Sequence, residues 1–149
     1  MKLVVQRVSE ASCTVDNKIT GKIGRGFMVL VGLGLGDTEE TVEKMAVKLS
    51  KLRIFEDGNG KINRSIFDID GKILSISQFT LYADAKKGNR PSFTDALGGE
   101  KAKDLYLYFN ECLRKLSIEV EEGIFGADMK VALVNDGLVT IILDSEVLW

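Results

Sequence analysis

The stretch Ile73-Leu-Ser-Ile-Ser-Gln-Phe-Thr-Leu-Tyr82 combines the apolar run of a buried β-strand with polar residues near its end. In a strand, Gln78 and Thr80 would lie on one face and Ser77 on the other, because side chains alternate between the faces of a sheet. Buried polar groups destabilise a fold by about 1–3 kcal/mol each unless they find hydrogen-bond partners. The pattern therefore predicts either side-chain bonds to neighbouring backbone or a functional site at this strand.

The rest of the chain predicts about eight strands and two main helices in one unit, residues 1–149. Apolar runs bounded by turn residues predict strands at residues 2–8, 11–15, 18–23, 27–33, 73–82, 118–121, 130–134 and 138–143. Asp37, with Glu40 three residues later, predicts an N-cap and a helix to about Leu52. Apolar periodicity predicts a second helix over residues 100–116, and residues 56–60 predict a hairpin loop. These elements indicate an α+β domain with a curved, largely antiparallel sheet or barrel.

Length and charge limit the classes of protein to which this chain can belong. Its 149 residues suffice for one domain with a sizeable core, and its formal net charge of −2 provides no overall basic field to attract nucleic acid. The longest apolar stretch, residues 27–35, is about half as long as a membrane span, and the N-terminus has no apolar signal-peptide core. We therefore expect a cytoplasmic protein with no membrane partner and no DNA partner, in which any contact with RNA is local.

The sequence contains no histidine. This absence excludes Ser-His-Asp and Cys-His catalysis, and it removes the commonest protein ligand of zinc. The two cysteines, Cys13 and Cys112, fall on apolar positions of a predicted strand and a predicted helix, so we interpret both as small core residues. We expect no metal site, and any chemistry must use hydroxyls, amides, carboxylates, backbone N–H groups or the substrate itself.

Gly32, Gly34 and Gly36 follow an apolar run, as the glycines of dinucleotide-binding sites do. The pattern G-x-G-x-x-G fails here, because its third glycine would fall at Asp37 or Glu39. We interpret the segment as a glycine-rich strand end in which the absence of side chains allows tight backbone packing.

The five residues Ser77-Gln-Phe-Thr-Leu81 resemble a signature of the D-aminoacyl-tRNA deacylases, small editing enzymes that hydrolyse D-amino acids from tRNA. Four further segments are similar to this family in order and spacing. They are Val5-Gln-Arg-Val8, Gly88-Asn-Arg-Pro-Ser-Phe93, Phe125-Gly-Ala-Asp-Met129 and Asn135-Asp-Gly-Leu-Val-Thr140. The resemblance runs from Met1 to Asp144 and implies the deacylase fold, a homodimer, an aminoacyl-tRNA substrate and no metal or organic cofactor.

The resemblance implies a catalytic segment of Ser77, Gln78, Phe79 and Thr80. Backbone N–H groups around Phe79 and Thr80 would form an oxyanion hole for hydrolysis of the ester between the amino acid and the terminal ribose. Thr80 is the only obvious nucleophile candidate, but without histidine no evident base would activate it. We therefore expect attack by water, assisted by the ribose 2′-hydroxyl, with Gln78 and Thr80 positioning groups.

Gly137 and Leu138 depart from the family pattern. On local grounds Asn135-Asp-Gly137 predicts a plain hairpin turn. In the family the matching Gly-Pro peptide is cis and enters the active site of the other subunit, where its carbonyls hold the amino group of a D-amino acid and its position excludes an L side chain. A cis bond costs about 2.5–4 kcal/mol before a non-proline residue, against roughly 0.5–1 before proline. We therefore expect a trans bond here and a weaker rejection of L-amino acids.

Other candidate residues have both an ordinary interpretation and one implied by the resemblance. Alone, Arg7 predicts a surface or edge position, Phe125 and Met129 predict core, and Lys86, Lys87 and Arg90 predict a solvated loop. The resemblance implies that Arg7 lies near the dimer seam and that Phe125 and Met129 lie at the pocket, where an aromatic ring could stack on the terminal adenine. It also implies that the three basic residues contact phosphates near the tRNA acceptor end.

Three other functions remain open at the level of the sequence. The first is a deacylase of relaxed chirality that also removes glycine or some L-amino acids. The second is a protein that binds the tRNA end without turnover, and the third is an interaction protein with no role in RNA chemistry.

Overall fold

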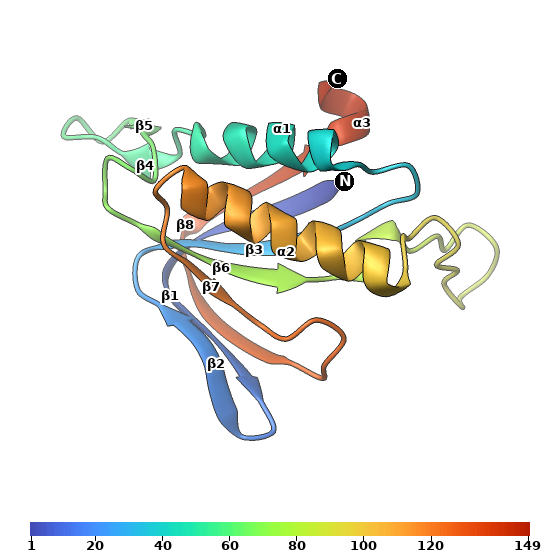
Figure 1. Cartoon of the computed structure of the whole chain (residues 1–149). Coiled ribbons are helices and arrows are strands. Elements are labelled where there is room, and N and C mark those ends of the chain that lie inside the picture. Colours follow the sequence, from blue (N-terminus) through green and yellow to red (C-terminus); the bar gives the residue numbers. More distant parts are fainter.

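Six strands form one curved sheet, and the two main helices cover the same face of it (Figure 1). The computed structural model describes all residues, 1–149. The sheet consists of β1 (Lys2–Val15), β2 (Lys18–Ile23), β3 (Gly26–Gly32), β6 (Lys72–Ser77), β7 (Val120–Glu122) and β8 (Lys130–Asp144). The other elements are α1 (Glu39–Ser50), the hairpin strands β4 (Phe55–Glu56) and β5 (Ile62–Arg64), the 3₁₀-helix η1 (Phe79–Tyr82), α2 (Gly99–Lys115) and α3 (Ser145–Leu148).

The α+β class, the two main helices and the curved sheet are confirmed, and the sheet is mixed. β1 pairs antiparallel with β2, β3 and β8, whereas β3–β6 and β6–β7 are parallel. The parallel pairs follow from connectivity, because α1 and α2 lie in the crossovers that return the chain to the same end of the sheet. The curl brings β2 against β7, where a Cβ on Gly21 would lie 2.9 Å from the carbonyl oxygen of Glu122. The sheet is therefore a nearly closed barrel.

The curved sheet separates two hydrophobic cores. The larger one lies between the sheet and the helices and includes Phe27, Met45 and Phe109. The smaller one lies on the concave side and consists of Val8, Ala11, Cys13, Ile23, Met28, Leu74 and Ile76. β1 contributes to both cores, because its pairing with β8 is irregular around Val8 and its buried face changes there.

Two predicted strand breaks are wrong. Residues 2–8 and 11–15 were predicted as separate strands because exposed residues interrupt the apolar pattern, but the backbone of β1 continues through a bulge. Likewise the predicted turn at residues 135–137 lies inside β8, where residues 136–139 bulge out opposite Arg7. In each case a bulge in the pairing of β1 with β8 leaves the same sequence pattern that a turn would leave.

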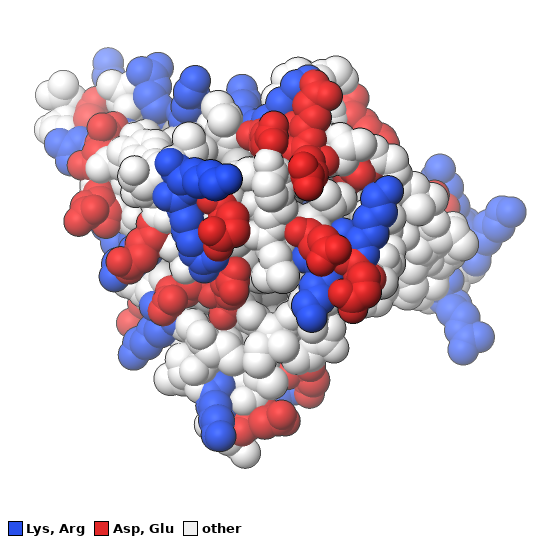
Figure 2. Space-filling model, in the orientation of Figure 1, with Lys and Arg blue, Asp and Glu red and all other residues white.

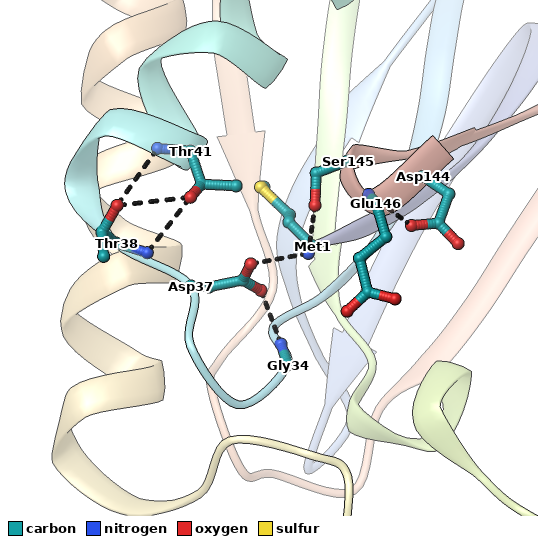
Figure 3. A network of polar contacts seen from close by, with 8 residues as sticks. All are labelled: Met1, Gly34, Asp37, Thr38, Thr41, Asp144, Ser145 and Glu146. Atoms are coloured by element: carbon teal, nitrogen blue, oxygen red, sulfur yellow. Dashed lines mark hydrogen bonds and ion pairs between the residues drawn. The ribbon is translucent and has the colours of Figure 1, made fainter. Parts of the chain in front are cut away.

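The prediction of Asp37 as a helix N-cap is also wrong. Thr38 caps α1, since its hydroxyl accepts from the N–H of Thr41 and the Thr41 hydroxyl accepts from the N–H of Thr38. Asp37 is instead buried beside the chain's first residue (Figure 3). The α-ammonium group of Met1 donates to Oδ1 of Asp37 at 2.8 Å and to Oγ of Ser145 at 2.8 Å, while Oδ2 of Asp37 accepts from the N–H of Gly34 at 2.6 Å.

Apart from the end of the strand predicted over residues 73–82, the remaining boundaries are close to those predicted. α1 ends at Ser50, α2 spans Gly99–Lys115, and β4 and β5 flank the predicted hairpin loop. No helix is long and apolar enough to cross a membrane.

Candidate active site

The signature segment changes from strand to 3₁₀-helix after Ser77, so the predicted strand over residues 73–82 is too long. The N–H of Gln78 makes a last bond to the carbonyl of Val31 at 2.7 Å, and its ψ of 87° then turns the chain out of the sheet. Phe79 and Thr80 are the first residues of η1. The predicted placement of Gln78 and Thr80 on one strand face is therefore wrong, although the Gln78 amide donates to the Thr80 hydroxyl across the turn.

Gly32, the last residue of β3, and Gly34, two residues further on, allow η1 to lie close to the sheet. A Cβ on Gly32 would lie 2.9 Å from Cβ of Leu81, and a Cβ on Gly34 would lie 2.6 Å from the ring of Tyr82. Such distances are shorter than carbon–carbon contacts permit. Tight packing therefore accounts for these two glycines, as their position at a strand end predicted. The same prediction is wrong for Gly36, where nothing lies within 4 Å of an added Cβ and a φ of 87° favours glycine instead.

A cavity of about 480 Å³ opens at the end of β6, and it brings together five of the predicted site residues. Ser77, Gln78 and Phe79 come from β6 and the start of η1, and Phe125 and Met129 come from the loop between β7 and β8. The remaining wall consists of Met28, Leu30, Val31, Leu33, Ile76, Leu97, Ala102, Gly126, Ala127, Asp128, Val131 and Leu133. Ser77 and Gln78 thus provide polar groups at one end of a cavity that is otherwise mainly apolar, and Phe79, Phe125 and Met129 belong to its apolar wall.

Tyr106 supports this cavity from behind, and the sequence analysis did not single it out. Its hydroxyl donates to the carbonyl of Ser75 at 2.7 Å, and its ring lies 6.0 Å from that of Phe125. The N–H of Gly123 reaches the same carbonyl at 3.2 Å, so one acceptor holds both the helix α2 and the start of the cavity loop. Burial raises the pKa of Tyr106, which keeps the hydroxyl protonated as a donor. The sequence held no signal for this role, because the carbonyl that Tyr106 binds lies 31 residues away in the chain.

Thr80 lies outside the cavity wall and is exposed. Its hydroxyl accepts from the Gln78 amide, and no carboxylate or lysine is bonded to it. Phe79 is 55% exposed at the rim, and its ring meets that of Phe93 edge to face with centroids 5.0 Å apart. No group of three or more His, Cys, Asp or Glu side chains is placed to hold a metal ion.

Arg7, Gly137 and Leu138 are adjacent to one another but do not line the cavity. Arg7 is only 5% exposed, so its interpretation as a surface residue is wrong. Its Nε donates to the carbonyl of Asp136 at 2.9 Å and its Nη1 to that of Ile54 at 2.7 Å. The Gly137–Leu138 peptide bond is cis, so the predicted trans bond is wrong. Leu138 is 70% exposed.

The three basic residues lie on the loop between η1 and α2. Two backbone bonds of 2.8 Å between Asp84 and Ser92 close this loop, and the N–H of Leu97 ties its other end to the carbonyl of Leu33 at 3.0 Å. Lys86, Lys87 and Arg90 lie between Asp84 and Ser92 in the chain and are exposed. Figure 2 shows mainly basic side chains on the projection at the right, where Figure 1 places this loop.

A family model described as D-Tyr-tRNA(Tyr) deacylase matches residues 4–144, which include all of the candidate site residues described above. The chain belongs to this family.

Relatives of the family that are named D-aminoacyl-tRNA deacylase match nearly the whole chain. The protein from Lactobacillus gasseri is 55% identical over 144 residues, covering 97% of this chain and 99% of the relative. The protein from Deinococcus radiodurans is 54% identical with the same coverage.

Two solved structures share the fold. One, titled c-Myc DNA Unwinding Element Binding Protein, has a TM-score of 0.90 and 45% identity, covering 97% of this chain and 98% of the other. The second, titled as a probable eukaryotic D-amino acid tRNA deacylase, has a TM-score of 0.81 at 18% identity over 95% of this chain and 97% of the other. The resemblance stated from five short segments is therefore confirmed as family membership, whereas the roles of the individual deacylase site residues stay predictions.

Proposed function

We propose that this chain is an editing hydrolase that cleaves the ester of D-aminoacyl-tRNA and releases a free D-amino acid and tRNA in the cytoplasm. The observation that carries the proposal is the cavity, which places Ser77, Gln78 and Phe79 beside Phe125 and Met129 in a chain of this family. Its apolar wall suits the flat face of an adenine, and its polar end suits the ester.

Two adjacent backbone N–H groups are suited to stabilise the oxyanion. Phe79 and Thr80 begin η1, and the first N–H groups of a helix have no acceptor within it. When water attacks the carbonyl carbon, negative charge develops on the carbonyl oxygen, and each donor aimed at that charge lowers the barrier by about 2.7–4 kcal/mol.

The attacking water needs a proton acceptor, and the substrate can provide the path. The water oxygen bonds to the carbonyl carbon, the bond between that carbon and the ribose oxygen breaks, and the ribose oxygen takes up a proton. The neighbouring ribose hydroxyl can pass this proton from the water to the leaving oxygen. Gln78 and Thr80, already bonded to each other, would orient the reacting groups.

The acceptor end of the tRNA would be held by Lys86, Lys87 and Arg90. Three phosphate contacts on a single strand give a slope of log K against log salt of about −2. Binding is therefore expected to weaken with salt far less than for a protein with an extended basic surface.

A homodimer is supported by the free edge of β8. This strand pairs with β1 alone, and its exposed side chains include Val134, Leu138 and Ile142. A long edge strand with exposed apolar residues is a surface that another chain commonly covers. Arg7 holds the bulge of β8 from beneath, which would present Gly137 and Leu138 to the site of a second copy. Sedimentation at micromolar concentration is expected to give a dimer, and a monomer would contradict this part of the proposal.

Deacylation of D-tyrosyl-, L-tyrosyl- and glycyl-tRNA by the purified protein tests the function. We expect rapid loss of the D ester, and substitution Gln78→Ala should slow it while Asn59→Ala, exposed in the loop between β4 and β5 and not part of the cavity, should not. Equal rates for D and L esters would indicate relaxed chirality, and tRNA binding without turnover would indicate an end-binding protein.

A further inference from the structure

We propose that Phe93, with Phe79 beside it, forms a stacking platform for an unpaired base of the RNA that precedes the terminal adenosine. This inference rests on the proposed function, since it names a further part of the same substrate. It concerns side chains at the rim, whereas the cavity itself would take the terminal adenosine.

The two rings are exposed at the position where a strand leaving the cavity would emerge. Phe79 is 55% and Phe93 is 37% exposed, and they hold each other in an edge-to-face contact with centroids 5.0 Å apart and planes at 67°. Edge-to-face packing uses the edge of one ring and leaves ring surface open to a further aromatic group. Phe79 also lines the cavity, so the platform is continuous with the site.

The platform is held in place rather than carried on a free loop. The bonds between Asp84 and Ser92 close the loop directly before Phe93, and the N–H of Ala96 donates to the carbonyl of Phe93 at 3.1 Å. Behind them, the N–H of Leu35 bonds to the carbonyl of Asp95 at 3.1 Å. A ring fixed in this way loses little conformational freedom when a base stacks on it.

Charge on the same loop favours a polyanion as the partner. The loop between η1 and α2 carries three positive side chains, Lys86, Lys87 and Arg90, and two negative ones, Asp84 and Asp95. The two aspartates lie at the edges of the basic segment, and residues 85–94 between them carry no negative side chain. Exposed aromatic rings next to basic side chains are the combination by which proteins bind single-stranded nucleic acid, with bases on the rings and phosphates on the cations.

The test measures binding, so it does not depend on turnover. A fluorescent single-stranded oligoribonucleotide ending in CCA is titrated with wild type, Phe93→Ala, Phe93→Leu and Phe93→Trp, and with Phe67→Ala as the control. Phe67 is 46% exposed but does not line the cavity. We expect Kd to rise about tenfold for the alanine and leucine variants, and to stay within twofold of wild type for the tryptophan and control variants.

A second probe, in which the nucleotide before the terminal adenosine lacks its base, identifies the stacked partner. Wild type is expected to bind it about tenfold more weakly than the intact probe, whereas Phe93→Ala should bind both probes equally. If removing the base weakened binding to Phe93→Ala as much as it weakened binding to wild type, the two effects would be independent and the proposal would be overturned. A leucine variant that binds as wild type does would also overturn it. Failure of deacylation with these binding results intact would count against the proposed function alone.

Discussion

Thr80 has a hydroxyl near the cavity but no neighbour that could take its proton. Its bonded partner is the Gln78 amide, which donates to the hydroxyl, and the chain has no histidine. A threonine hydroxyl is a weak nucleophile unless a base activates it. The environment of Thr80 therefore favours a positioning role.

We expect Thr80→Ala to retain measurable deacylation, slowed about tenfold, because it loses one orienting hydrogen bond of roughly 1.4 kcal/mol. Thr80→Ser, which keeps the hydroxyl, is the matched control. Single-turnover deacylation of D-tyrosyl-tRNA measures both variants. Complete loss of activity, together with an acylated Thr80 trapped in wild type, would identify a nucleophile instead.

The family resemblance, rather than any local pattern, placed several residues at the pocket, and residues whose environment depends on a distant segment were predicted poorly from local pattern. Ser77, Gln78 and Phe79 of the signature meet Phe125 and Met129 at one cavity, whereas Thr80 lies outside its wall. Arg7 is buried because carbonyls 47 and 129 residues away accept its hydrogen bonds, which no local pattern reveals. The expectation of relaxed chirality was argued from a trans bond at Leu138 and has no support from the structure.

Among the elements, the transition from β6 to η1 positions the candidate site. The apolar pattern of residues 73–82 predicted one strand, since a buried 3₁₀ turn and a buried strand can carry the same run of apolar residues. What distinguishes them is tertiary: Gly32 and Gly34 leave room for Leu81 and Tyr82 to pack over the end of β3. The glycines were interpreted correctly as sites of close packing, but their partner was not identifiable from the sequence.

Gly32→Ala is therefore expected to displace η1 and with it the N–H groups of Phe79 and Thr80. The added Cβ would lie 2.9 Å from Cβ of Leu81 and 3.2 Å from the carbonyl oxygen of Gln78, so η1 must shift. Deacylation should fall by about a hundredfold or more, because small misplacements of reacting groups have effects of this size. Gly24→Ala, with nothing within 4 Å, is the control and should be neutral. A fully active Gly32→Ala would show that the position of η1 does not matter.

At the scale of the whole molecule, Asp37 binds the first residue of the chain, which in turn contacts Ser145 near the other end. Its carboxylate is buried against the Met1 ammonium, which also reaches Ser145 (Figure 3). Removing one partner of a buried ion pair leaves an uncompensated charge and costs about 3–5 kcal/mol. The N-cap prediction was wrong because this partner lies 36 residues away, while Thr38 satisfies the helix end locally.

Asp37→Asn is expected to lower the free energy of unfolding by about 3 kcal/mol or more in urea denaturation. Asp144→Asn is the control, because Asp144 caps α3 through its bond to the N–H of Glu146 and asparagine caps equally well. The control should change stability by less than about 0.5 kcal/mol. Equal effects of the two substitutions would argue against a stabilising ion pair at the N-terminus.

The three tyrosines make the free energy of unfolding depend on pH in the alkaline range. Burial raises the pKa of Tyr82, with the Asp37 carboxylate adding to the effect, and burial also raises the pKa of Tyr106. The pKa of Tyr108 is raised because its hydroxyl donates to the carboxylate of Glu43. All three therefore favour the neutral form in the folded state over the unfolded chain, where tyrosine titrates near 10.

The sign of the resulting pH dependence follows from linkage. Below about pH 10 the tyrosines are neutral in both states, so their contribution is fully present. Above that pH the unfolded chain ionises first, and Tyr82 and Tyr106, whose pKa values burial raises, each lower the free energy of unfolding by up to about 1.4 kcal/mol per pH unit. In a Tyr108→Phe variant, which leaves only these two tyrosines, we expect tyrosinate absorbance to rise near pH 10 in concentrated urea, but in buffer only together with the loss of circular dichroism. Ionisation near pH 10 in this variant while the circular dichroism stays native would contradict this, because a buried hydroxyl cannot release its proton at the ordinary pKa without leaving its environment.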